Sequence, residues 1–352
     1  AILELKLYRL AKLEIQIIRK ELAEKRKRAG SIGQLLKDED SRWDIVRDEI
    51  KEVVADFGHS KTSVRAARMT SIASSVDEPE FTAEDFIIPE DNHVLVTWDG
   101  WVKRQKEIRD PSTTRLREGD AVLSVFGGST RATCVFFTNY GAAYTCRIID
   151  IPATTGYGEP IQKLFKLKDG EKVVTAFGLD PRTIGDIEED PQRPEYAPPI
   201  HAVAVTSDGY CFRFGLEPFV EPSTRNGRRY ARPAKGAQVI GVASIHGAET
   251  MVAVTKNARA LLCPCEEVTY LSGPGKGVKL IRLAKEDSLL GFRAAIDDRD
   301  TLTVKTSLGG QQRINTARYE VSSRGGKGRL LLKRGFLTGI LAEESVAPDL
   351  PE

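Results

Sequence analysis

Lysine and arginine gather with glycine in short segments along the second half of the chain. Residues 272–277 read Ser-Gly-Pro-Gly-Lys-Gly, residues 323–328 read Ser-Arg-Gly-Gly-Lys-Gly, and the longer segment 225–236 is rich in arginine. Glycine lets backbone N–H groups approach an anion closely, and Lys and Arg supply positive charge. A row of such loops fits the phosphodiesters of a bent nucleic-acid duplex, one loop after another along the backbone.

These loops give a set of candidate phosphate-binding residues. The side chains are Lys103, Arg104, Arg225, Arg228, Arg229, Lys235, Lys276, Lys279, Arg282, Arg324, Lys327, Arg329, Lys333 and Arg334. The loop glycines are Gly156, Gly158, Gly227, Gly236, Gly275, Gly277, Gly325, Gly326 and Gly328. The alternative is that each Gly-Lys-Gly is only a turn between strands with a solvated lysine. The recurrence of the loops along the chain favours anion binding.

The charge distribution points the same way. The whole chain carries a formal net charge of +2, but residues 200–340 hold 22 Lys and Arg against 12 Asp and Glu, a net +10. A basic half within a nearly neutral chain is typical of a polyanion partner.

Other chemistries find little support. The five cysteines form no CxxC pair, which suits a reducing cytoplasm, and Cys263 and Cys265 fit ordinary strand positions better than a metal site. The four histidines are scattered, and no phosphate-binding Walker loop, nucleophile elbow or HExxH motif occurs. No apolar run approaches the roughly 20 residues of a membrane span. We therefore predict no catalytic residue, no metal site and no membrane segment in this chain.

A pattern that recurs five times from residue 94 onward predicts the fold. Each repeat has an apolar run, a threonine and a tight turn, with the threonines 41, 68, 49 and 51 residues apart (Thr97, Thr138, Thr206, Thr255 and Thr306). This period is typical of radially repeated small sheets, which bury their apolar faces only against their neighbours. Another β run is expected after three of the basic loops (238–240, 278–281, 329–332). The long spacing coincides with the acidic, proline-rich stretch 180–199, which we interpret as a loop inserted on the rim.

The first 59 residues read as helix. Apolar residues at three- and four-residue steps predict a coiled-coil seam, a break is expected at Gly30 and Gly33, and a second helix at 40–57 would stop at Gly58. The predicted organisation is a helical segment 1–59, a linker 60–90, an all-β domain 91–341 and an acidic tail 342–352.

Several of these segments resemble one protein family. Residues 324–328 (Arg-Gly-Gly-Lys-Gly) are similar to the glycine-rich box of bacterial DNA gyrase A subunits, and the repeats look like the β-pinwheel of type IIA topoisomerases. Residues 2–14 resemble that subunit's helix near the lower dimer gate, and residues 44–58 its returning coiled-coil helix. The resemblance covers nearly the whole chain. It implies an all-β, five-bladed β-pinwheel, propeller-like, preceded by an α-helical coiled-coil segment.

Within the family, the departures favour the A subunit of topoisomerase IV. Gyrase has its box on the first blade and usually six blades, whereas the first loop here (111–119) has no box and five repeats are found. Residues 100–103, 156–160 and 271–277 look like topoisomerase IV. The A subunit of DNA gyrase, whose C-terminal domain wraps DNA, is the alternative.

The resemblance also implies a role and partners. The domain would bind and bend the transported duplex during ATP-dependent strand passage, decatenation and relaxation in the bacterial cytoplasm. Its partners would be double-stranded DNA, the B (ATPase) subunit that holds ATP and Mg, and a second A subunit in a homodimer. The family's cleavage tyrosine lies upstream of Ala1, and Tyr8 is expected to be a packing residue, so this chain alone is not expected to cut DNA.

A less specific alternative is a non-enzymatic propeller that serves as a scaffold for protein partners, because fold alone does not determine function. The basic loops argue against it. Salt-dependent DNA binding discriminates between the two hypotheses.

Overall fold

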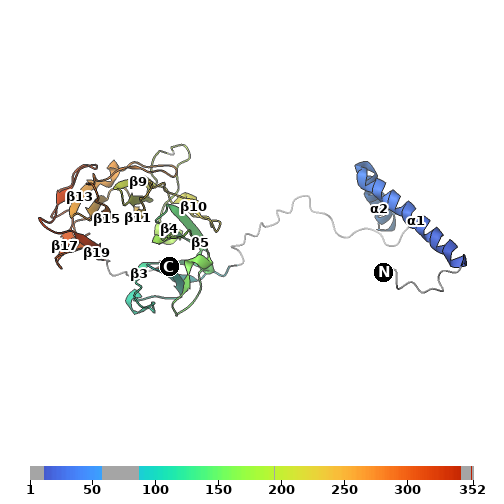
Figure 1. The fold of residues 1–352 in the computed structure, drawn as a ribbon, viewed down its shortest axis with the longest axis horizontal. Coiled ribbons are helices and arrows are strands. Elements are labelled where there is room, and N and C mark those ends of the chain that lie inside the picture. Colours follow the sequence, from blue (N-terminus) through green and yellow to red (C-terminus); the bar gives the residue numbers. More distant parts are fainter. Residues whose placement is uncertain (1–11, 58–86, 194, 342–349, 351–352) are drawn as a thin grey trace. The chain divides into compact units, whose positions relative to one another are not determined.

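The protein is described here by a computed structural model, which describes residues 12–57, 87–193, 195–341 and 350. The chain forms two compact units, Ala1–Pro79 and Glu80–Glu352. The first holds the helices α1 (Lys12–Lys37) and α2 (Glu39–Phe57), and the second is the β-domain (Figure 1).

The predicted break at Gly30 and Gly33 is wrong, because α1 continues through both glycines. A glycine in a helix interior costs about 1 kcal/mol relative to alanine, which weakens a helix without ending it. The interruption lies at Asp38, whose carboxylate accepts hydrogen bonds from the Asp40 N–H at 3.2 Å and the Ser41 hydroxyl at 2.5 Å. Asp38 thus acts as the N-cap of α2.

Apolar side chains of both helices are exposed within this unit: Ile17 is 56% exposed, Trp43 59% and Val54 59%. The coiled coil therefore stays a prediction. The first part of its predicted seam and Gly58 lie outside the described residues.

Within the residues that the structure describes, the β-domain consists of five antiparallel sheets, which we call blades 1 to 5. Blade 1 contains β1 (Asp91–Thr97), β2 (Trp101–Gln105), β3 (Val122–Ser129) and β6 (Glu159–Pro160). Blade 2 contains β4 (Thr133–Thr138), β5 (Ala142–Arg147), β7 (Val173–Gly178) and β10 (Arg228–Arg229). Blade 3 contains β8 (His201–Thr206), β9 (Tyr210–Phe214), β11 (Val239–Ile245) and β14 (Val278–Lys279). Blade 4 contains β12 (Thr250–Thr255), β13 (Arg259–Pro264), β15 (Leu289–Ala295) and β18 (Arg329–Leu330). Blade 5 contains β16 (Leu302–Thr306), β17 (Gln311–Ile314) and β19 (Leu337–Ile340).

The sheets follow one another around the β-domain in chain order (Figure 1). The prediction of an all-β, five-bladed pinwheel preceded by helices is confirmed. The three β runs expected after basic loops are not equivalent to one another, however. Residues 239 and 240 begin the long strand β11, whereas Val278 and Arg329 begin strands of only two residues.

Each of the first four blades takes its outer strand from the following repeat. The two-residue strand β14, for example, comes after β13 of blade 4 in the chain but pairs with β9 of blade 3. β6, β10 and β18 are exchanged in the same way, with β2, β5 and β13 as their partners. Blade 5 has three strands among the described residues, and β17 is its outer edge.

The recurring threonine has a structural cause. Its hydroxyl oxygen accepts the N–H of the fourth residue onward in every repeat, at 3.1 to 3.3 Å (Trp101, Ala142, Tyr210, Arg259 and Gly310). In all five blades, the pairing register between the strand that ends at this threonine and its neighbour also shifts at the threonine, as at a β-bulge. The neighbouring strands are β3, β7, β11, β15 and β19. The hydroxyl thereby satisfies a backbone donor at each turn.

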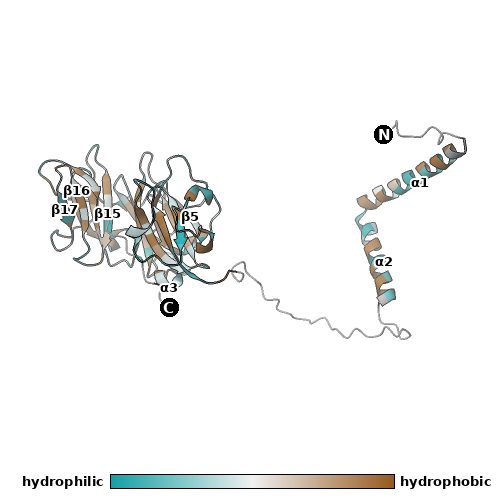
Figure 2. Ribbon diagram, turned by 90° about the horizontal axis from the view of Figure 1, so that it is seen from below, coloured by the Kyte–Doolittle hydropathy of each residue, from teal (hydrophilic) through white to brown (hydrophobic). Residues whose placement is uncertain are grey.

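The apolar core lies between the blades. Alternate residues of a strand point to opposite faces of its sheet. In β4, Val135 and Phe137 pack toward blade 3, whereas Cys134 and Phe136 pack toward blade 1. Since such strands are buried on both faces, their central residues are continuously apolar, as the brown strands of Figure 2 show. None of the helices in the described part of the chain has the length and apolar content needed to cross a membrane.

Candidate nucleic-acid interface

The basic loops of successive repeats are hydrogen-bonded to one another. The Lys166 N–H donates to the Arg225 carbonyl at 2.8 Å, the Arg232 N–H to Gly275 at 2.9 Å, and the Arg282 N–H to Gly326 at 2.7 Å. The loops therefore form one continuous strip along the outer strands of blades 1 to 4. We call it the loop belt and define it as residues 158–166, 225–236, 272–285 and 323–334.

Four glycines of the loop belt are required by steric contact with the neighbouring blade. A Cβ on Gly158, Gly227 or Gly328 would lie 2.5, 2.7 or 2.6 Å from a carbonyl oxygen of the strand that the loop joins, and Gly277 would clash with the Cys211 carbonyl. All four have positive φ, between 67° and 89°. These glycines therefore seat the outer strand against its blade, a role that the sequence did not reveal.

The other loop glycines are less uniform. Gly236 and Gly325 also have positive φ, and Gly236 has open space where a Cβ would be. Gly156, Gly275 and Gly326 have no such backbone requirement but lie close to neighbouring side chains.

Ten of the predicted basic side chains are exposed on the loop belt. They are Arg225, Arg229, Lys235, Lys276, Lys279, Arg282, Lys327, Arg329, Lys333 and Arg334. The structure thus brings together most of the candidates on one continuous strip.

Lys103 is a correction to the predicted site, because its side chain is fully buried. Its ammonium donates hydrogen bonds to the carbonyls of Arg115 at 2.7 Å and Gly156 at 3.0 Å. Burial lowers the pKa of this lysine, since the charged form loses hydration. Lys103 joins two loops from the inside and does not reach a phosphate.

Three predicted arginines are half-buried and bound to protein groups. Arg104 donates to the Ile151 carbonyl at 2.8 Å, and Arg324 to the Glu267 carbonyl at 2.8 Å. The Arg228 guanidinium donates to the Pro218 carbonyl and lies 3.7 Å from Glu221. These side chains position the loops, with only part of each guanidinium open to solvent.

Several cations of the interface lie over aromatic rings. Lys276 Nζ is 3.9 Å from the centroid of the Tyr210 ring, and Lys279 Nζ is 5.7 Å from it. Arg329 lies 5.7 Å from the centroid of Tyr319. Such contacts orient a cation without neutralising its charge. Lys276 also lies 3.8 Å from the Asp208 carboxylate, which offsets part of its charge.

Arg232 and Lys285 are exposed on the loop belt but are absent from the residues predicted from the sequence. Counted from the glycine that seats each outer strand, the second, fifth and eighth residues are basic in two repeats: Arg229, Arg232 and Lys235 after Gly227, and Lys279, Arg282 and Lys285 after Gly277. Alignment of the repeats on these glycines, instead of on the threonines, would have found both residues.

The first loop differs from the others. Gly119 has a φ of 82° and lies three residues before β3, as Gly236 lies three residues before β11. It is therefore equivalent to Gly236 and not to the four glycines that seat the outer strands, Gly158, Gly227, Gly277 and Gly328. The loop's exposed Arg115 and Arg117 stack on Tyr157 and Trp101, at 5.2 and 4.6 Å from the ring centroids.

Comparison with known proteins finds matches to the A subunits of type IIA topoisomerases. The family model described as "DNA gyrase C-terminal domain, beta-propeller" matches residues 133–179, 201–245 and 249–295, which are the second, third and fourth repeats. The DNA gyrase A subunit of Mycolicibacterium smegmatis is 28% identical over 359 residues, covering 97% of this chain and 40% of the relative. That of Mycobacterium tuberculosis is 27% identical, with the same shares. The chain thus spans about 40% of the length of these relatives.

Solved structures share the fold of the β-domain. The C-terminal domain of a DNA topoisomerase IV has a TM-score of 0.62 and 20% identity, covering 73% of this chain and 78% of that one. The C-terminal domain of E. coli ParC has a TM-score of 0.56 and 21% identity, covering 72% and 98%.

Proposed function

We propose that this chain carries the C-terminal domain of a type IIA topoisomerase A subunit and that its loop belt binds and bends a DNA duplex. The observation that carries the proposal is the loop belt itself. Exposed Lys and Arg side chains recur on loops that are hydrogen-bonded in series across four blades.

The arrangement favours phosphates over bases as the groups recognised. The basic residues lie on short loops and two-residue strands, with no helix of the β-domain longer than the four residues of α3 (Pro181–Ile184) in the described part of the chain. Reading base edges in the major groove takes a helix or a β-ribbon that enters it. Since the blades follow one another around the domain, a duplex that touches successive loops is bent, and binding depends on charge and deformability more than on sequence.

The test is the salt dependence of duplex binding by the full chain. We expect affinity to fall steeply with salt, with a log–log slope of about 0.9 for each phosphate neutralised. Replacing Arg229, Lys279, Arg282 and Lys333 by alanine should weaken binding at low salt and flatten the slope by up to about 0.9 for each lost phosphate contact.

A matched variant controls for net charge. The control replaces four exposed cations that lie off the loop belt, Lys106, Lys172, Arg299 and Lys305, by alanine, and should leave the slope nearly unchanged. Equal slopes for the two variants, or binding that ignores salt, would contradict the proposal.

For the whole protein, we propose ATP-dependent strand passage together with a B subunit that holds ATP and Mg, in a complex with two A subunits in the bacterial cytoplasm. The cleavage tyrosine would lie in the part of the A subunit that precedes this chain. Topoisomerase IV is our preferred assignment, supported by the absence of an Arg-Gly-Gly-Lys-Gly box from the first loop and by the five blades. Gyrase is the alternative, supported by the names of the curated relatives.

A further inference from the structure

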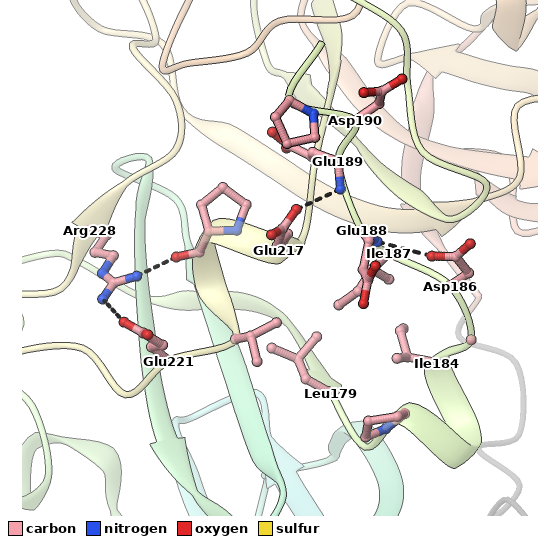
Figure 3. A pocket seen from close by; sticks show the side chains of 15 residues that line it. Leu179, Ile184, Asp186, Ile187, Glu188, Glu189, Asp190, Glu217, Glu221 and Arg228 are labelled. Carbon is pink, nitrogen blue, oxygen red and sulfur yellow. Dashed lines mark hydrogen bonds and ion pairs between the residues drawn. The ribbon is translucent and has the colours of Figure 1, made fainter. Parts of the chain in front are cut away.

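The segment inserted between β7 and β8 forms one wall of a pocket of about 700 Å³ (Figure 3). The opposite wall is the segment 217–221, which follows β9. The volume lies within the usual range of about 300–1,000 Å³ for pockets that hold a ligand. The DNA-binding proposal does not use this pocket.

Polar contacts hold the walls of the pocket in place. At the start of the insertion, the Asp180 carboxylate accepts the Ser129 N–H at 2.8 Å and pairs with Arg182 at 2.8 Å. Between the walls, the Glu189 N–H donates to the Glu217 carboxylate at 2.6 Å, and Tyr270 donates to the Glu189 carboxylate at 3.0 Å. The pocket is therefore formed before any partner arrives.

The pocket has an apolar floor and an acidic rim. Leu179 and Ile187 are buried, and Ile184 and Val220 lie beside them on the floor. The rim carries six carboxylates and one guanidinium; the acidic residues are Asp186, Glu188, Glu189, Asp190, Glu217 and Glu221. Figure 3 shows the carboxylates on both walls, with the guanidinium of Arg228 turned toward Glu221.

We infer that this pocket binds a basic segment of a partner polypeptide, with an apolar side chain on the floor and Lys or Arg side chains on either side of it. The charge of the rim is complementary to such a segment. Each ionised carboxylate has two oxygens and about four acceptor sites. The internal contacts of Glu189 and Glu217 use only part of this capacity. Nucleic acid is excluded, because its phosphates would face carboxylates.

The location of the pocket places the partner beside the loop belt. Arg228 contributes to the pocket, and the next residue, Arg229, is exposed on the loop belt. A partner held here would lie next to the proposed DNA path. This inference stands independently of the proposed function.

Fluorescence anisotropy with the full chain tests the inference. The probe is a labelled peptide with two central leucines and three Lys or Arg on each side. Replacing the exposed Glu188, Asp190 and Glu221 by Gln, Asn and Gln should weaken peptide binding by about tenfold, as expected for losing three rim ion pairs of a fraction of a kcal/mol each. Affinity for duplex DNA should not fall in this variant, which separates the inference from the DNA-binding proposal.

Two controls make the result decisive. The variant Glu118→Gln, Asp169→Asn, Glu266→Gln removes three exposed carboxylates outside the pocket and should bind the peptide like the unmodified chain. A peptide with two glycines in place of the leucines should bind more weakly, because it leaves the floor empty. The inference would be overturned if both acid variants weakened peptide binding equally, or if both peptides bound equally well. It would also be overturned if spermidine, added at the same concentration of positive charge as the peptide, displaced the peptide completely.

Discussion

Glycine and the basic residues have separate roles in the loop belt. The seating glycines bring the backbone against the neighbouring blade, and the exposed Lys and Arg side chains project from the strip that results. Glycine was expected to expose N–H groups to an anion, but in Gly158, Gly227, Gly277 and Gly328 the missing side chain makes room for a carbonyl oxygen. The structure of the loop belt therefore depends on these glycines, and its positive charge depends on the Lys and Arg residues that lie between them.

Gly277→Ala should destabilise the β-domain by about 2 kcal/mol or more. The residue has a φ of 78°, and a methyl group there would clash with the Cys211 carbonyl; a left-handed alanine alone costs about 1–2 kcal/mol. Urea unfolding measures the loss. Gly273→Ala in the same loop is the control, because nothing lies within 4 Å of its Cβ position. Equal stability of both variants would show that the close approach is not maintained in solution.

His201 should make the stability of the β-domain depend on pH. It is 2% exposed, and burial, together with the charge of Arg213, lowers its pKa from 6.5, against the opposing effects of the Pro198 carbonyl and Glu249. The unfolded chain therefore binds more protons than the folded one below about pH 6.5, so stability is complete above that pH and falls as the pH drops toward the lowered folded value.

The measurement compares melting temperatures at pH 7.5 and 5.5. The unmodified chain should lose more than His201→Gln, which lacks the titrating group, while both retain the nearby His246 and Glu249. An identical loss in the two proteins would assign the pH dependence to other groups.

At the scale of elements, the outer strands explain what the sequence could predict and what it could not. The turns at Thr97 and its four equivalents were predictable, because a threonine followed by a left-handed glycine or alanine repeats along the chain. The exchange of β6, β10, β14 and β18 was not, because two residues carry no periodicity and their pairing is with a distant segment. The burial of Lys103 depends on the same exchange, since one of its acceptors, Gly156, lies just before β6.

The insertion is attached to blade 1 through the buried Asp180 carboxylate and through an Arg182–Asp91 ion pair at 2.6 Å, and Asp180 also holds Arg182, so Asp180→Ala should be costly. Asp180 caps α3 by accepting the Arg182 N–H at 3.0 Å and also accepts the Ser129 N–H of β3. Losing a cap and a charged hydrogen bond to a partly buried N–H should cost about 2–3 kcal/mol in urea unfolding. Asp169→Ala, at an exposed position, should change stability by less than about 0.5 kcal/mol. A similar effect of both substitutions would refute the attachment.

At the scale of the whole molecule, the position of the box separates the two subunit assignments. The Arg-Gly-Gly-Lys-Gly sequence lies in the fifth repeat, and its strand β18 completes blade 4. If the proposed topoisomerase IV assignment holds, the intact complex, with no box on the first loop, should decatenate and relax DNA without introducing negative supercoils in the presence of ATP. Gel assays of plasmid topology with the A and B subunits measure this. Efficient negative supercoiling would assign the chain to gyrase, and the proposed DNA-binding role of the loop belt would be unaffected.

The strand exchange also fixes the order in which the domain can be completed during synthesis. The ribosome delivers β1 to β3 first, but blade 1 stays open until residues 159–160 emerge, and blade 4 until residues 329–330 do. A nascent chain therefore always carries one unpaired sheet edge, the kind of surface that promotes association with other chains. Truncation within one repeat therefore also removes the outer strand of the blade before it, so a cut between two repeats leaves an open sheet edge on the preceding blade.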